Sequence, residues 1–153
     1  MKHYPVMLPE VIAAMELNVI GLDRDPNVHK RVKELQVKNS NRFSFIETKF
    51  SEMDRIDLPM VDAVVMDIGV SSMQIDRAER GFSFMRSGPL DMRMSSTGAT
   101  AADAVNLLSY DNLVRIFKVY GEEKYSRKAA DAIIKSRQNK YIETTADLAS
   151  IIE

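Results

Sequence analysis

The chain has 153 residues, a formal net charge of −1 and no cysteine. This length fits one domain of ordinary size, which buries roughly 70% of its unfolded surface and can therefore build a core. The composition excludes disulfides and cysteine-ligated zinc, and it provides no overall basic field that would attract RNA over long range. Apolar runs fall short of the ~20 residues of a membrane span, and the N-terminus lacks a secretory pattern, so we expect a location in the cytoplasm or an organelle matrix.

The first half of the chain has the pattern of an α/β unit. Residues 9–15 predict a short helix with Pro9 in its first turn, where proline is tolerated. Residues 18–22 predict a strand, and Asn27 is a candidate N-cap of the helix that follows. Residues 43–47 alternate between apolar and polar side chains and predict a second strand.

A third strand is predicted over residues 61–67, where the apolar run from Ala63 to Met66 suits a buried parallel strand. A polar loop follows this strand. Because open α/β sheets bind ligands just outside the carboxyl ends of their strands, the loop is the expected position of a site. Its polar candidates are Asp67, Ser71, Ser72 and Gln74.

The second half, from Thr100 onward, has a helical pattern. Thr100 and Ser109 are candidate N-caps of two successive helices, and the second helix stops at Gly121. A third helix has an apolar stripe of alanine and isoleucine, and Thr144 and Thr145 cap a last helix over residues 146–153. The polar surface of the third helix carries Lys124, Arg127, Lys128, Lys135 and Arg137. These cations are either a solvated face or contacts for RNA.

Two segments carry a family resemblance. The sequences DIGVSSMQID (67–76) and ERGFSFMRSGPLDMRM (79–94) resemble the signature of the ribosomal RNA small subunit methyltransferase H family, also called MraW. Matching segments follow the family order at HYPVMLPEVI (3–12), GLDRDP (21–26) and YGEEKYSRKAADAII (120–134). The resemblance implies transfer of a methyl group from S-adenosyl-L-methionine to the exocyclic N4 of a cytidine. The implied partner is small-subunit ribosomal RNA or the ribosomal subunit, with no metal and no membrane.

The implied fold is a Rossmann-like class I methyltransferase α/β sheet, here incomplete, with an inserted all-helical module. We expect an α/β domain over residues 1–96 and a helical module over 97–153, with 95–98 as the linker. The family carries a strand, a Gly-rich loop and a helix of about 30 residues ahead of the GLDRDP segment, whereas here Asn18 runs straight into Val19. The family also continues past the last helix. We therefore expect a shortened form.

The resemblance also implies contacts to the cofactor. Asp23 matches the residue that binds the ribose diol, Phe50 matches the residue that packs on the adenine, and Asp67 and Gln74 match further contacts. From the residues alone, Asp23 is equally well a helix cap or a solvated aspartate, and Phe50 is equally well a core residue. Asp25 is expected to have only a capping or solvated role.

The catalytic candidates are Asp67, Ser71 and Ser72. Methylation of an amine requires groups that orient its lone pair and accept its proton as the new bond forms. The sequence does not decide which candidate is the base, and all three could instead stabilise the turn.

Two arginines and two phenylalanines alternate at Arg80, Phe82, Phe84 and Arg86, a composition suited to stacking on an unstacked base while holding phosphates. The alternative is a pair of core phenylalanines flanked by surface arginines. Ser87 replaces an aspartate that is usual in the family. Because the Gly-rich loop is missing, a non-catalytic remnant that binds RNA without turnover is the main alternative function. A dehydrogenase is disfavoured because no GxGxxG precedes the first acidic strand end.

Overall fold

The computed structural model describes residues 18–39, 41–66 and 69–153, so the predicted helix at 9–15 lies outside the described residues. By its internal contacts the chain divides into two compact units. Unit 1 is Met1–Gly69 with Met94–Ser96, and unit 2 is Val70–Arg93 with Thr97–Glu153. The chain makes its last passage from unit 1 to unit 2 within residues 95–98, the predicted linker. The predicted domain division at residues 96 and 97 stays a prediction.

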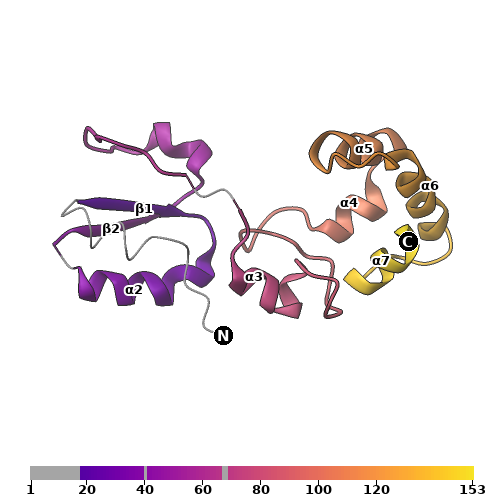
Figure 1. The fold of residues 1–153 in the computed structure, drawn as a ribbon, viewed down its shortest axis with the longest axis horizontal. Coiled ribbons are helices and arrows are strands. Elements are labelled where there is room, and N and C mark those ends of the chain that lie inside the picture. The colour runs from indigo at the N-terminus through magenta and orange to yellow at the C-terminus, as the bar shows by residue number, and fades with distance from the viewer. Residues whose placement is uncertain (1–17, 40, 67–68) are drawn as a thin grey trace. The chain divides into compact units, whose positions relative to one another are not determined.

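Unit 1 contains a parallel two-stranded sheet covered by one helix (Figure 1). Its elements are β1 (Val19–Asp23), the 3₁₀ turn η1 (Pro26–Val28), α2 (His29–Lys38), β2 (Phe43–Glu47) and the 3₁₀ helix η2 (Phe50–Arg55). The predicted bounds of both strands, β1 and β2, lie within one residue of the observed bounds. The strands pair in register from Val19 opposite Phe43 to Asp23 opposite Glu47. A small core of Val32, Leu35 and Phe43 joins α2 to the sheet.

The start of α2 differs from the prediction, because Asn27 is not its N-cap. Asp25 caps the preceding turn η1: its Oδ1 accepts hydrogen bonds from the backbone N–H of Asn27 at 3.0 Å and from the Asn27 side chain at 2.8 Å. Pro26 explains the shift, since proline is favoured at the first helical position and places the cap one residue before itself. The capping role expected for Asp25 is confirmed.

The predicted strand over residues 61–67 is wrong for the described part of this structure. Residues 61–66 belong to no strand, and Val64, Val65 and Met66 are 56%, 85% and 66% exposed. A doubly wound sheet explains the failure, because its first strand lies between the second and the fourth. By the resemblance, β1, β2 and residues 61–67 match the second, third and fourth strands of the family, and the missing segment contains the first. The apolar run therefore has the sequence of a central strand without the neighbour that would bind its backbone.

Unit 2 is helical, and helices were predicted for its part from Thr100 onward. Its elements are α3 (Ser72–Asp76), η3 (Ala78–Arg80), α4 (Ala101–Leu107), α5 (Tyr110–Arg115), the π-helix η4 (Ile116–Tyr120), α6 (Ser126–Arg137) and α7 (Thr145–Ile152). The predicted N-caps Thr100, Ser109 and Thr144 are confirmed, and η4 ends at the residue before Gly121. Thr145 is the first residue of α7 and not part of its cap.

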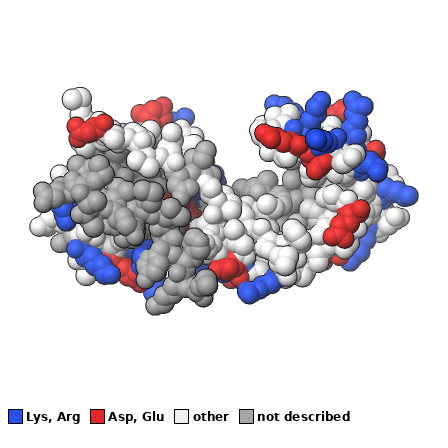
Figure 2. Space-filling model, in the orientation of Figure 1, with Lys and Arg blue, Asp and Glu red and all other residues white. Residues whose placement is uncertain are grey.

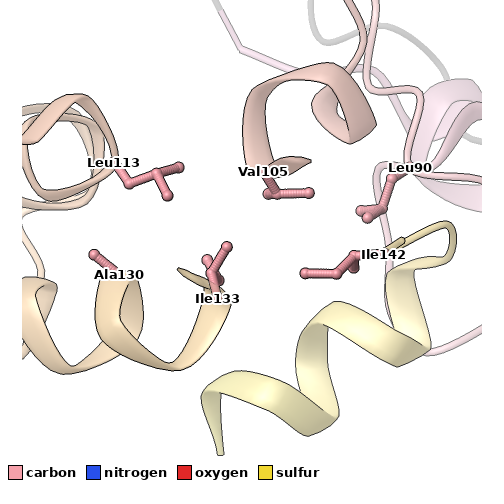
Figure 3. Close-up of a cluster of buried hydrophobic side chains, with 6 residues drawn as sticks. All are labelled: Leu90, Val105, Leu113, Ala130, Ile133 and Ile142. Carbon is pink, nitrogen blue, oxygen red and sulfur yellow. The ribbon is translucent and has the colours of Figure 1, made fainter. Parts of the chain in front are cut away.

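The core of unit 2 brings together buried side chains from three helices, α4, α5 and α6, and from two loops (Figure 3). Its buried members are Leu90, Val105, Leu113, Ala130, Ile133 and Ile142. The predicted stripe of α6 supplies Ala130 and Ile133, which are both 0% exposed. This stripe therefore anchors α6 against α4 and α5.

Two polar side chains fix the loops around this core. The Asn106 side chain bonds both backbone groups of Ile142: Nδ2 donates to the carbonyl at 2.8 Å, and Oδ1 accepts from the N–H at 3.0 Å. Arg137 Nη1 donates to the carbonyls of Val105 and Leu108, at 3.0 and 2.7 Å. Arg137 thus binds the last turn of α4, which corrects its assignment to the cationic surface of α6.

Two capping boxes make unit 2 sensitive to acid. Hydrogen bonds from the backbone and hydroxyl of Thr100 lower the pKa of Asp103, and the hydroxyl of Thr144 lowers the pKa of Asp147. Because the folded-state pKa values are depressed, the stabilisation is present above the unfolded pKa of about 3.9 and is lost as the pH falls through the folded values. We expect the thermal midpoint of unit 2 to fall below about pH 4.

The check is a pair of melts at pH 7 and pH 3, followed by circular dichroism. The Asp103→Asn, Asp147→Asn double variant should lose much of this pH dependence, whereas the exposed Asp131→Asn variant should keep it. An equal fall in all three proteins would contradict the role of the caps.

Candidate functional site

The carboxyl edge of the sheet in unit 1 carries Asp23. Its Oδ1 accepts a hydrogen bond from the backbone N–H of Asp25 at 2.8 Å, and its carbonyl accepts from Thr48 N at 3.0 Å. Oδ2 has no hydrogen-bond partner within the described ranges, and the residue is exposed. One carboxylate oxygen is therefore available to a donor such as a ribose hydroxyl.

Phe50 follows β2 at the same edge. It is the first residue of η2 and is 60% exposed, so the alternative of a core phenylalanine does not hold in this structure. Because β1 and β2 are parallel and Asp23 pairs with Glu47, Asp23 ends one strand and Phe50 follows the carboxyl end of its neighbour. An accessible aromatic ring and an accessible carboxylate at one edge of the sheet suit an adenosine, which has a flat base and a diol.

Arg24, next to Asp23, also has an unused polar atom. Its Nη2 donates to Ser95 Oγ at 2.8 Å, while its Nε is buried without a hydrogen-bond partner in the described structure. A buried orphaned donor is costly and calls for an explanation, such as a bound group. The sheet edge thus has both an acceptor and a donor that the described residues leave unsatisfied.

The polar loop of the signature begins outside the described residues, because Asp67 is not described. Ser71 caps α3, and its Oγ accepts from Gln74 N at 3.3 Å while Gln74 Oε1 accepts from Ser71 N at 2.9 Å. Gln74 is 6% exposed. Both side chains therefore have a structural role in a capping box. Ser72 is the first residue of α3, and the predicted cofactor and catalytic roles of this loop stay predictions.

The arginine and phenylalanine motif is partly assembled in unit 2. The Arg80 guanidinium lies 5.7 Å from the centre of the Phe82 ring, and its Nη2 donates to the Arg93 carbonyl at 2.9 Å. Arg86 Nη1 donates to the Asp76 carbonyl at 3.2 Å. Phe84 is 66% exposed, so it is not the core residue of the alternative reading. Arg80 and Phe82 are brought together, whereas Phe84 presents its ring to solvent.

The end of the signature has a structural function that the sequence did not reveal. Leu90 is 3% exposed, its N–H donates to Glu143 O at 2.9 Å, and its carbonyl accepts from Ala102 N at 2.7 Å. Thr145 N donates to Gly88 O at 2.9 Å. Residues 88–91 are therefore clamped between the starts of α4 and α7. The partners lie far away in sequence, so no local pattern could have identified this role.

Two glycines of the signature permit this clamp. Gly81 has φ +70°, and a Cβ there would collide with the Pro89 carbonyl oxygen. A Cβ on Gly88 would collide with the Ala78 backbone. Glycine is required at both positions because backbone approaches backbone.

Asp91 and Arg93 form a two-pronged ion pair at the clamp. Arg93 Nε donates to Asp91 Oδ1 at 3.0 Å and Arg93 Nη2 to Oδ2 at 2.6 Å. These hydrogen bonds hold the pKa of Asp91 below its ordinary value. A pocket of about 220 Å³ lies beside the pair. It is lined by Pro89, Leu90, Asp91, Thr100, Ala102, Tyr141 and Glu143.

Other classes of site leave no trace in the described ranges. Among residues 18–39, 41–66 and 69–153, no group of three histidine or acidic side chains could hold a metal ion. Within the same ranges, the helices are too short or too polar to cross a membrane.

Comparison with known proteins identifies the family. Residues 2–153 match the MraW methylase family. The chain is 51% identical over 146 residues to the ribosomal RNA small subunit methyltransferase H of Maricaulis maris, covering 93% of this chain and 44% of the relative. It is 44% identical over 178 positions to the protein of the same name from Agrobacterium fabrum, covering 99% of this chain and 52% of the relative.

The alignment with the Agrobacterium relative also shows that residues are missing inside the aligned region. Its 178 positions exceed the 153 residues of this chain, so at least 25 positions of the relative have no counterpart inside the aligned region. The chain spans about half the length of the curated relatives it matches. The unmatched internal positions agree with the predicted internal deletion, and the chain belongs to the MraW methylase family.

Proposed function

We propose that this chain transfers a methyl group from S-adenosyl-L-methionine to the exocyclic N4 of a cytidine in small-subunit ribosomal RNA, on a class I methyltransferase sheet. The observation that carries the proposal is the family match over residues 2–153, together with relatives named ribosomal RNA small subunit methyltransferase H at 44–51% identity. The cytoplasm or an organelle matrix is the corresponding location.

Asp23 and Phe50 are the proposed contacts to the adenosine of the cofactor. The unsatisfied Oδ2 of Asp23 would accept from the ribose hydroxyls, and the exposed Phe50 ring would pack on the adenine. Asp67 and Gln74 are the proposed contacts to the remainder. When bound, S-adenosyl-L-methionine supplies a methyl group on a positively charged sulfur, which an amine can attack.

The acceptor amine must be oriented and must lose a proton. Among Asp67, Ser71 and Ser72, only Asp67 has a side chain that is an ionised acceptor at neutral pH. Ser71 Oγ already accepts from Gln74 N. We therefore assign proton acceptance to Asp67 and positioning of the loop to Ser71. Arg80, Phe82, Phe84 and Arg86 are the proposed RNA contacts of the signature.

The test is transfer of tritium from labelled S-adenosyl-L-methionine to small ribosomal subunits that lack the modification, with the product identified as N4-methylcytidine. Asp67→Asn should lower the rate by about a hundredfold or more, the usual contribution of a general base. Asp57→Asn, an exposed aspartate of unit 1, should leave the rate unchanged. Equal rates for Asp67→Asn and the parent would refute the assignment of the base.

A non-catalytic role is the second candidate, and one observation favours it. Residues 61–66, which precede Asp67, have no strand beside them in the described structure, and the related protein has at least 25 further positions. A chain that binds ribosomal RNA and cofactor but transfers no methyl group would support this candidate.

A further inference from the structure

A run of exposed aromatic and basic side chains, here called the tyrosine–lysine surface, lies where η4 leads into α6 in unit 2. It consists of Lys118, Tyr120, Lys124, Tyr125, Arg127 and Lys128. Most of these residues lie in the family-matching segment at 120–134, but the site residues assigned above do not explain the exposed rings. Nor does the core of unit 2, which these side chains do not join.

The backbone beneath this surface has an unusual and well-defined geometry. A π-helix leads into it, and Gly121 N donates to Ile116 O at 3.1 Å and Glu123 N to Phe117 O at 2.9 Å. Glu122 has φ +51°, an uncommon conformation for a residue other than glycine. The Glu123 carboxylate then accepts from Tyr125 N at 2.7 Å. π-helices and left-handed residues of this kind concentrate at functional positions, because their cost must be offset by use.

This geometry holds two tyrosine rings in solvent. Tyr120 is 73% exposed and Tyr125 is 70% exposed, and the neighbouring Val119 is 58% exposed. The Lys128 ammonium lies 5.9 Å from the centre of the Tyr125 ring. Exposed rings next to cations are the combination with which single-strand binding surfaces stack bases and hold phosphates.

The cations of this surface are available. In the part of the chain that the structure describes, Lys118, Lys124 and Lys128 form no ion pair, even though Glu122 and Glu123 are close in sequence. Lys and Arg side chains gather over the α5 and α6 end of unit 2, with acidic residues among them (Figure 2). Because the whole chain has a net charge of −1, attraction of a polyanion depends on a local patch of this kind.

We propose that the tyrosine–lysine surface binds single-stranded RNA, with bases stacked on Tyr120 and Tyr125 and phosphates held by the surrounding lysines. Stacking accepts every base, and exposed aromatics interleaved with cations are how proteins bind unpaired strands. The identity of this RNA as ribosomal rests on the proposed function. The surface adds a second RNA contact to the Arg80–Arg86 motif within unit 2.

The chain has no tryptophan, so a Tyr125→Trp variant provides a single fluorescent reporter. Titration with a 12-nucleotide oligouridylate should quench its emission. In parallel, fluorescence anisotropy of labelled oligouridylate should give a dissociation constant for each variant. The double variant Tyr120→Ala, Tyr125→Ala should raise this dissociation constant at least fivefold. The double variant Tyr120→Phe, Tyr125→Phe should keep the parent value, because stacking needs only the ring.

Charge is tested by Lys124→Glu with Lys128→Glu. The matched control is Lys30→Glu with Lys33→Glu on α2, in unit 1. The Lys124→Glu, Lys128→Glu variant loses two phosphate contacts, and each contact to a single strand contributes about 0.7 to the slope of log affinity against log salt concentration. The magnitude of this slope should therefore fall by about 1.4. The control pair should leave the slope unchanged.

Calorimetric titration of S-adenosyl-L-methionine into the same variants separates the two proposals. If the variants lose oligouridylate binding but still bind S-adenosyl-L-methionine, the proposed RNA-binding role of the tyrosine–lysine surface is supported. If the tyrosine and lysine variants bind oligouridylate as tightly as the parent, the proposed RNA surface is refuted. It is also refuted if the parent chain binds S-adenosyl-L-methionine but not oligouridylate. Neither result affects the proposed cofactor site. Equal binding of polyglutamate and oligouridylate also overturns it, because the surface would then attract any polyanion.

Discussion

Replacing Ile133 with alanine is expected to destabilise unit 2 by about 2–5 kcal/mol, the range measured for buried isoleucine truncations. Ile133 is 0% exposed and lies at the centre of the cluster that joins α6 to Leu113, Val105 and Ile142 (Figure 3). The substitution removes these contacts and leaves a cavity that rigid neighbouring helices cannot fill. Because domains are stable by only roughly 5–15 kcal/mol, this is a large share of the total.

Urea denaturation followed by the helical circular dichroism signal measures this effect. The midpoint should fall without a change in the dependence on urea, since the surface exposed on unfolding is nearly the same. Ile152→Ala is the matched control, because Ile152 lies in α7 and is 41% exposed. Equal midpoints for the two variants would show that Ile133 is not central to the fold.

Restoring the missing segment is expected to lower the dissociation constant for S-adenosyl-L-methionine by about ten- to a hundredfold. The insert would be the unmatched positions of the Agrobacterium relative, placed between Asn18 and Val19, the junction that the family resemblance indicates. It would supply the strand that residues 61–66 lack and a loop whose backbone N–H groups can bind the cofactor. A hydrogen bond to a charged group contributes roughly 1.5–3 kcal/mol, and each 1.4 kcal/mol is tenfold in affinity.

A linker of the same length made of glycine and serine controls for the mere addition of residues. It should leave the affinity unchanged, since it has no apolar strand to insert beside β1. Hydrogen exchange should also show slower exchange at Val64 and Val65 only in the chain with the native insert. If the native insert and the linker give the same affinity and the same exchange, the missing strand is not what weakens the site.

Local chemistry made much of unit 2 predictable. Thr100, Ser109 and Thr144 each precede a helix and offer a side-chain oxygen to the first turn, so their role follows from three or four neighbouring residues. The α6 stripe follows from helical spacing alone. These features need no knowledge of distant partners.

Features that depend on distant partners were not predictable. Residues 61–66 have an adequate strand sequence, but a strand requires a neighbour, and the neighbour is absent from the described structure. Arg137 has the composition of a surface cation, yet it caps α4 across the core. Leu90 is buried through contacts made more than ten residues away.

The residues of the candidate site likewise include some that could be predicted from local sequence and some that could not. The resemblance selected Asp23 and Phe50, and their position at one edge of a parallel sheet follows from the strand pattern. The capping box of Ser71 and Gln74 was readable from the Ser-x-x-Gln spacing, a signal that the cofactor interpretation overlooked. Arg24, with its orphaned Nε, has no local signal, because burial alone makes it notable.

The most direct test is calorimetric titration of S-adenosyl-L-methionine into the 153-residue chain, alongside its Asp23→Asn, Phe50→Ala and Asp57→Asn variants. We expect saturable binding by the parent and by Asp57→Asn, and weaker binding by Asp23→Asn and Phe50→Ala, because these two side chains form the adenosine contacts at the sheet edge. An absence of binding by a chain whose circular dichroism shows the folded helices, or equal binding by all four proteins, would contradict the proposed cofactor site.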